Sequence, residues 1–149
     1  MRAILQRVTA AEVRVAGRCV GKIRSGFVVL LGIGRDDNEA DAEFIVDRVL
    51  GLRVFADGAG KMNLALGAVG GELLVVSQFT LYADTSQRRP SFLGAASPQD
   101  AQRLYEHFIW LARARDVRVE SGEFGAHMEL SIVNDGPVTI ILDSRNRQA

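Results

Sequence analysis

One stretch constrains the fold more than any other, because in it a run of apolar residues gives way abruptly to polar ones. Residues 73–76 are continuously apolar, which is typical of a short β-strand that is buried on both faces. Ser77, Gln78 and Thr80 then follow, where a core strand would carry no hydroxyl or amide groups. Burying such groups is unfavourable unless they form hydrogen bonds. These polar side chains therefore either form hydrogen bonds to neighbouring backbone where the strand ends in a turn, or line a site that binds a polar ligand.

The length and composition indicate one ordinary globular domain. The chain has 149 residues, of which 48% are hydrophobic and 24% are charged, and a chain of this length can bury one core. It contains no apolar run of the roughly 18 residues that a membrane-spanning helix needs. Its first residues read directly into a strand without the pattern of a signal peptide. We therefore expect a single domain over residues 1–149, with a polar tail from about residue 144, in the cytoplasm and without contact to a membrane.

The cysteine and histidine content argues against a metal site. Cys19 is the single cysteine, so the chain can form neither an internal disulfide nor a cysteine-based zinc site. His107 and His127 have no cysteine or second histidine near them in the sequence. We expect no metal and no cofactor.

Charge is balanced overall but unevenly distributed along the chain. The net charge is zero, which argues against a general nucleic-acid binder and against DNA as a partner. Residues 1–35 nevertheless hold seven arginine or lysine residues and one glutamate, whereas residues 36–47 hold six acidic residues and no basic one. The folded chain can thus show a basic face, or these residues can be the solvated faces of strands. The sequence favours neither interpretation.

The apolar patterns predict about eight strands and two helices. The helices are expected at residues 38–50 and 99–114. The glycine-rich residues 67–71 lack the spacing of a phosphate-binding loop and are expected to form a hairpin connection. Because most strands follow one another through short turns, we expect an α+β fold: a largely antiparallel, barrel-like sheet with the two helices packed outside. The strands are predicted at residues 1–15, 18–23, 27–33, 52–55, 73–76, 117–120, 128–133 and 138–142.

The loop at residues 82–92 contains two adjacent arginines, Arg88 and Arg89. Loops on a rigid scaffold often carry function, and an arginine pair beside a pocket can bind phosphate. The same pair can equally be exposed and solvated. Both interpretations remain open from the residues alone.

A second polar segment, residues 134–139, separates the last two predicted strands and reads Asn-Asp-Gly-Pro-Val-Thr. Proline cannot donate a hydrogen bond to a sheet, so Pro137 must lie at a sheet edge, a bulge or an exposed loop. The bond before a proline adopts the cis form at low energetic cost, and a rigid corner at Gly136 and Pro137 can present a backbone carbonyl in a fixed direction. The simpler alternative is a plain turn.

Together, the two polar segments resemble the two signature motifs of the D-aminoacyl-tRNA deacylase family, of the D-tyrosyl-tRNA deacylase type. The motifs here are residues 77–81, Ser-Gln-Phe-Thr-Leu, and residues 134–139. One departure is the loop at residues 84–89, which is a residue shorter than the family leads one to expect and lacks a glycine, so details of a tRNA contact there do not transfer. The resemblance runs over residues 1–143, and four further segments agree with it: residues 6–8, 61–64, 89–92 and 122–126.

The resemblance implies a homodimer with its active site at the subunit interface and aminoacyl-tRNA as the substrate. The implied reaction is hydrolysis of the ester that joins a D-amino acid to the terminal adenosine of tRNA. In the family the Gly-Pro bond is cis, and each subunit inserts it into the pocket of its partner. Gly136 and Pro137 would then form a chiral filter, whose carbonyls bind the α-amino group and clash with an L side chain. Such a filter would also admit glycine, including glycine mischarged on tRNA for alanine.

The mechanism implied for the site needs no protein nucleophile. Ester hydrolysis requires a nucleophile and groups that stabilise the developing oxyanion. Thr80 is the one hydroxyl in the first motif that fits a nucleophile, but no histidine, lysine or carboxylate beyond Asp135 lies in either motif to act as its base. We therefore favour a site in which the 2′-OH of the RNA helps to activate water and the backbone N–H groups of Phe79 and Thr80 form the oxyanion hole. Ser77 and Gln78 would position the adenosine or hold the pocket.

Contacts to the phosphates of tRNA are expected from basic residues, and the candidates are Arg7, Arg88 and Arg89. Two alternatives to the enzyme stay open. One is a non-catalytic tRNA-binding module that uses the same pocket, which turnover alone distinguishes because both would bind RNA in a salt-sensitive way. The other is a relative whose Gly-Pro bond is trans and which removes L-amino acids from mischarged tRNA. Residues 77–79 and 135–138 differ from those expected of such a relative.

Overall fold

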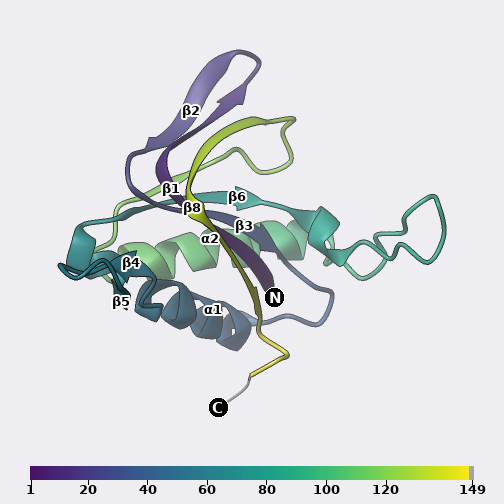
Figure 1. The fold of residues 1–149 in the computed structure, drawn as a ribbon. Helices are drawn as coiled ribbons and strands as arrows, with labels where there is room; N and C mark the ends of the chain where they lie inside the picture. The colour runs from purple at the N-terminus through teal and green to yellow at the C-terminus, as the bar shows by residue number, and fades with distance from the viewer. Residues whose placement is uncertain (148–149) are drawn as a thin grey trace.

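The structure is a computed structural model, and it describes residues 1–147. Its central sheet is built from β1 (Arg2–Val15), β2 (Arg18–Ile23), β3 (Gly26–Gly32), β6 (Glu72–Ser77), β7 (Val119–Ser121) and β8 (Glu129–Asp143). These strands lie in the order β2-β1-β3-β6-β7, and β8 pairs with β1. The two helices, α1 (Glu39–Gly51) and α2 (Pro98–Arg113), lie below the sheet in Figure 1, and the β1–β2 hairpin rises above it.

The sheet is mixed and curls into a nearly closed barrel, which confirms the expected α+β fold. β1 pairs antiparallel with β2, β3 and β8, whereas β6 lies parallel to both β3 and β7. The chain between β3 and β6 passes through α1 and a small ribbon of β4 (Phe55–Ala56) and β5 (Met62–Leu64). The expectation of a hairpin at residues 67–71 is therefore wrong. These residues lie in and after a 3-10 turn, η1 (Leu66–Val69), that leads into β6.

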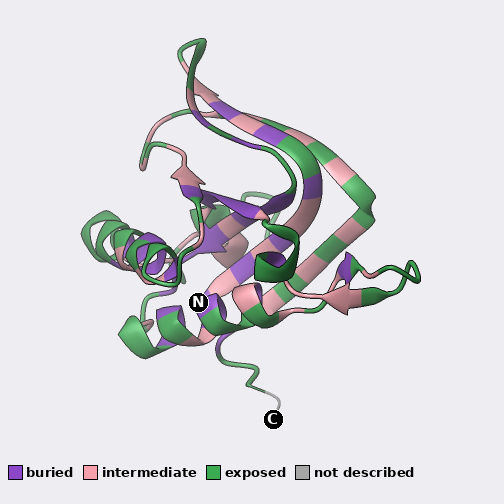
Figure 2. Ribbon diagram, turned by 90° about the vertical axis from the view of Figure 1, so that its left-hand side faces the viewer, coloured by how far each residue is buried: buried purple, intermediate pink, exposed green. Residues whose placement is uncertain are grey.

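β3 and β6 are buried on both faces, as their continuous apolar runs predict. Side chains on the helix side join one core cluster, which includes Phe27, Leu73 and Phe108. Side chains on the opposite side, among them Val28 and Leu74, join a second cluster inside the curled sheet. Figure 2 shows buried residues in this middle layer and on the inner faces of the helices. Packing on two sides therefore holds the end of β6, where the polar residues begin.

Both helices begin at a residue whose side chain caps the first turn. Asn38 caps α1 and forms a capping box with Asp41. Ser97 caps α2 by accepting a hydrogen bond from the Asp100 N–H, and Pro98 occupies the first turn. Neither of these helices, nor any other within residues 1–147, has the length and apolar character needed to cross a membrane.

β8 carries the Gly-Pro segment and contains no buried residue. Its positions alternate between exposed and half-buried, as Figure 2 shows along the strand. Asn134 and Thr139 keep their pairing with β1, but residues 135–138 between them bulge out opposite the single residue Arg7. The predicted interruption between two strands is therefore a bulge within one long strand.

The polar segment after β8 is held against the start of the chain. Ser144 is buried, and its N–H donates to the Met1 carbonyl at 2.9 Å. Arg147 forms an ion pair with Asp41 of α1 at 3.3 Å. The remainder of the predicted polar tail, residues 148–149, lies outside the described residues.

Candidate functional site

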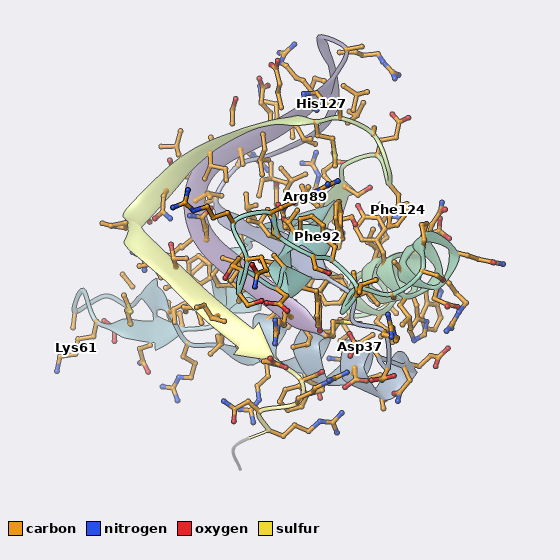
Figure 3. The ribbon with its side chains drawn as sticks, turned by 90° about the vertical axis from the view of Figure 1, so that its right-hand side faces the viewer. Asp37, Lys61, Arg89, Phe92, Phe124 and His127 are labelled. Carbon is orange, nitrogen blue, oxygen red and sulfur yellow. The ribbon has the colours of Figure 1, made fainter. Side chains whose placement is uncertain are left out.

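A cavity of about 550 Å³ opens where β6 ends, a size common among small-molecule sites. Its walls come from the end of β6, the loop that precedes α2, the first turn of α2 and the segment that leads to β8. In Figure 3 the loop that carries Arg89 and Phe92 faces the viewer, with Phe124 beside it. The lining side chains include Ser77, Gln78, Phe79, Phe92, Phe124 and His127.

Ser77 and Gln78 line the cavity at the point where polar residues follow the apolar run. Ser77 is the last residue of β6 and lies half-buried at the cavity. The Gln78 N–H donates to the Leu31 carbonyl at 2.8 Å, and its side-chain amide donates to the Thr80 hydroxyl. In this bond the Gln78 side chain thus contacts another side chain and not backbone, while Ser77 and Gln78 both lie in the cavity wall. Thr80 itself is exposed and is not part of the wall.

A 3-10 turn, η2 (Phe79–Tyr82), follows Gln78 directly. Its i→i−3 hydrogen bonding begins with the Leu81 N–H, which donates to the Gln78 carbonyl at 3.2 Å. The N–H groups of Phe79 and Thr80 precede this bond, and the first N–H groups of a helical turn have no partner within it. The Phe79 and Thr80 N–H groups therefore have no partner within the turn, and of these two residues Phe79 lines the cavity.

Phe79 and Phe92 form an aromatic edge of the cavity. The Phe79 side chain is 54% exposed although it is large and apolar. The two rings lie 5.1 Å apart and meet edge to face, with 73° between their planes. Such an edge suits a flat, partly apolar ring as a ligand.

Gly136 and Pro137 do not line this cavity and are exposed on the bulge of β8. The peptide bond between them is cis. The Asn134 side chain accepts a hydrogen bond from the Val138 N–H at 2.8 Å and so closes the bulge. Gly136 has a φ of +137°, and a Cβ there would lie 2.7 Å from the Val138 side chain. Both the positive φ and this close contact favour glycine at this position.

The Arg7 side chain contacts the bulge and is only 12% exposed. Its Nε donates to the Asp135 carbonyl at 3.1 Å and lies 3.4 Å from the Asp135 carboxylate, while a terminal nitrogen donates to the Val54 carbonyl. The forked guanidinium can make these contacts at once. The sequence groups Arg7 with Arg88 and Arg89, but those two are exposed on the projecting loop of Figure 1.

Phe124 and His127 border the cavity but are not among the site residues that the sequence identifies. Phe124 falls within a segment noted only for its resemblance to the family, and His127 is exposed. No periodicity marks them, because this wall is assembled from segments far apart in the sequence. Neither His127 nor any other His, Cys, Asp or Glu between residues 1 and 147 belongs to a group of three that could hold a metal ion.

Comparison with known proteins agrees with the motifs. The family model described as D-Tyr-tRNA(Tyr) deacylase matches residues 4–143. A D-aminoacyl-tRNA deacylase of Dehalococcoides mccartyi is 57% identical over 148 residues, which cover 99% of this chain and 97% of that protein. Another, of Thermosipho africanus, is 53% identical over 146 residues, which cover 97% and 98%. Among solved structures, the c-Myc DNA unwinding element binding protein superposes with a TM-score of 0.91 at 39% identity and covers 96% of this chain and 98% of that one.

Proposed function

The chain belongs to the D-aminoacyl-tRNA deacylase family, and from this premise we propose that it hydrolyses the ester between a D-amino acid and the terminal adenosine of tRNA. It is then a hydrolase of carboxylic esters, and its products are the free D-amino acid and tRNA. We expect the reaction in the cytoplasm, where aminoacyl-tRNA is made and used. The observation that carries the proposal is the cavity at the end of β6, which the start of η2 and an aromatic edge border.

The terminal adenosine would bind against the aromatic edge. Bases stack on exposed aromatic side chains, and Phe79 and Phe92 offer such a surface. The Ser77 hydroxyl and the Gln78 amide then supply polar contacts to the sugar or the base. This arrangement leaves the ester carbonyl close to the first N–H groups of η2.

A homodimer would complete the site. Among the described strands, β8 pairs only with β1, so its other edge has free backbone groups. β8 also exposes two large apolar side chains, Val133 at 57% and Ile141 at 73%, and exposed apolar strand edges are typical of interfaces. A partner that packs there would bring its own Gly136 and Pro137 towards the cavity. This geometry is consistent with their position outside the cavity of their own chain.

Gly136 and Pro137 of the partner subunit would select the D configuration. Their carbonyls would accept hydrogen bonds from the α-amino group and leave no room for a side chain on the L side. A filter that reads only backbone geometry accepts many D side chains. It also admits glycine, so glycine mischarged on tRNA for alanine would be a second substrate.

The chemistry would use water and the RNA itself. The terminal 2′-OH helps to activate a water molecule, which attacks the ester carbonyl carbon. The oxyanion that develops is stabilised by the N–H groups of Phe79 and Thr80. The bond between the carbonyl carbon and the 3′ oxygen then breaks. The 3′ oxygen takes up the proton that the attacking water has lost, and the tRNA leaves. No side chain forms a covalent intermediate in this scheme.

Thr80→Ala is expected to keep kcat/KM within about tenfold of the wild-type value, because it removes only the hydrogen bond from the Gln78 amide. Steady-state release of D-tyrosine from D-tyrosyl-tRNA measures this directly. Complete loss of turnover, with tRNA binding and the folded state intact, would instead make the Thr80 hydroxyl the nucleophile.

Substituting both Arg88 and Arg89 by glutamine is expected to raise KM and leave kcat nearly unchanged. For each phosphate that the variant no longer neutralises, the slope of log affinity against log salt should fall by roughly 0.7–0.9. Arg103→Gln is the matched control, because Arg103 is an exposed arginine of α2 that pairs with Glu39. If the double variant and the control had equal salt slopes, the two loop arginines would not contact the phosphates of tRNA. Arg7 is the least available of the three candidates, since Asp135 and Val54 already engage it.

The experiment that tests the proposal separates turnover from binding. D-tyrosyl-tRNA in excess over purified protein should be hydrolysed through many turnovers. Salt-sensitive binding of the same tRNA without release of tyrosine would favour the alternative, a non-catalytic tRNA-binding module.

A further inference from the structure

The buried carboxylate of Asp37 lies where the start of the chain, the loop after β3 and η2 meet. Its side chain is 1% exposed, and one carboxylate oxygen lies 2.7 Å from the α-ammonium group of Met1, which is fully buried. The other oxygen accepts hydrogen bonds from the Gly34 N–H and, at 3.3 Å, from the Tyr82 hydroxyl. Asp37 therefore ties together three segments that are distant in sequence. None of its described contacts belongs to the cavity itself.

One of these segments supports a wall of the cavity. Gly34 forms a bridge with Ala95, and on either side of it the Arg35 N–H donates to the Gly94 carbonyl and the Ala96 N–H to the Ile33 carbonyl, each at 3.0 Å. The side chains that line the cavity here are those of Ile33, Ala95 and Ala96. The bond from Asp37 to Gly34 therefore fixes the strand-like pairing that carries this wall.

Another segment is η2, whose last residue is Tyr82. A Cβ on Gly34 would lie 2.8 Å from the Tyr82 ring, so the ring packs directly on that glycine. The Arg2 guanidinium stacks 4.6 Å above the same ring and donates to the Leu81 carbonyl at 3.0 Å. Burial, and next the charge of Asp37, raises the pKa of the Tyr82 phenol far above its ordinary value. The phenol therefore stays neutral and can donate.

We propose that Asp37 and Tyr82 are positioning residues of the reaction: they fasten the far end of η2 and the Ile33–Ala96 wall so that the N–H groups of Phe79 and Thr80 keep their direction. This inference rests on the proposed function, because those N–H groups matter only if an oxyanion forms there. Neither side chain touches the substrate. Misplacing a reacting group by about 1 Å can cost on the order of a hundredfold in rate, so a small rotation of η2 is enough to be measured.

The test compares Tyr82→Phe, Asp37→Asn and a matched control, Tyr105→Phe. Tyr105 is buried and Tyr82 is half-buried, and burial raises the pKa of both phenols, that of Tyr105 to about 12. The Tyr105 hydroxyl donates to the Val75 carbonyl at 2.9 Å on the helix side of the sheet. Tyr82→Phe should lower kcat for D-tyrosyl-tRNA roughly tenfold with KM unchanged, as expected when alignment and not binding is lost. Asp37→Asn should lower it further, and Tyr105→Phe should leave it unchanged.

A second readout follows the backbone directly. The amide signals of Phe79 and Thr80 in an N–H correlation spectrum should shift in Tyr82→Phe and stay in place in Tyr105→Phe. Asp37→Asn removes the carboxylate that forms an ion pair with the Met1 ammonium; should this variant fail to fold, Tyr82→Phe decides alone. An unchanged kcat in Tyr82→Phe, or a lower kcat with unmoved amide signals, overturns the positioning role. A wild-type protein without any turnover overturns the proposed function as well, which distinguishes the two failures.

Discussion

Phe79→Pro is expected to lower kcat for D-tyrosyl-tRNA by about 10²–10³-fold, the loss typical when one oxyanion donor is removed. Proline has no N–H, so the substitution removes one of the two donors that η2 presents. Proline is also tolerated at the first position of a helical turn, which is the position of Phe79 in η2. The turn should therefore persist while its donor is lost.

Phe79→Ala is the control that distinguishes the effect of losing the backbone N–H from the effect of losing the aromatic ring. It keeps the N–H and removes the edge-to-face packing on Phe92, so its main effect should be a higher KM. Single-turnover rates at saturating protein give the comparison. Equal loss of rate in the proline and alanine variants would mean that the Phe79 N–H does not stabilise the transition state.

Gly136→Ala is expected to reduce the preference for D-tyrosyl-tRNA over L-tyrosyl-tRNA by about 10- to 100-fold. The new Cβ would lie 2.7 Å from the Val138 side chain and 3.0 Å from the Val138 nitrogen, at a φ of +137° that alanine rarely adopts. The bulge must therefore shift, and with it the carbonyls that would read the configuration of the substrate. A shift of about 1 Å suffices for an effect of this size.

Gly58→Ala is the matched control for this variant. Gly58 lies in the exposed turn between β4 and β5, and a Cβ there would meet nothing within 4 Å. Its D-to-L ratio should equal that of the wild type. If Gly136→Ala also kept the wild-type ratio while remaining folded, the Gly-Pro segment would have no role in chiral selection.

The central strands could be predicted from the sequence because continuous runs of apolar residues indicate that they are buried. The apolar runs of β3 and β6 face two core clusters, one on each side of the sheet. The pairing of β6 was not predictable in the same way, because a run buried on both faces does not reveal which neighbours it will have. The glycines at residues 67–71 favoured a hairpin, but the chain had already crossed over through α1 and β6 enters parallel to β3.

The candidate site was predictable where its residues are consecutive. Ser77, Gln78 and Phe79 line the cavity as one short stretch after β6. Phe124 and the contacts of Asp37 with Met1 and Tyr82 were not predictable, because only folding brings these segments together. Contacts of long side chains are also hard to predict. The hydrogen bonds of Arg7 to the Val54 and Asp135 carbonyls cannot be inferred from any local sequence pattern.

The uneven charge of the first 35 residues illustrates the same limit. The sequence left open whether these arginines form a basic face or solvated strand surfaces. In the structure, several are paired with acidic residues, most of them from distant segments: Arg2 with Asp143, Arg7 with Asp135, Arg14 with Glu12, and Arg24 with Glu72. Their charge is thus largely compensated locally, and the exposed pair at Arg88 and Arg89 stands out more clearly as a candidate for binding phosphate.

The most direct test of chiral hydrolysis at this cavity is a paired single-turnover measurement on one tRNA charged with either D-tyrosine or L-tyrosine, using purified protein and no added metal. We predict rapid release of D-tyrosine, while L-tyrosyl-tRNA decays at its uncatalysed rate. Release of both forms at similar rates would contradict the chiral filter. Release of neither, with the tRNA still bound, would contradict the assignment of hydrolysis to this cavity.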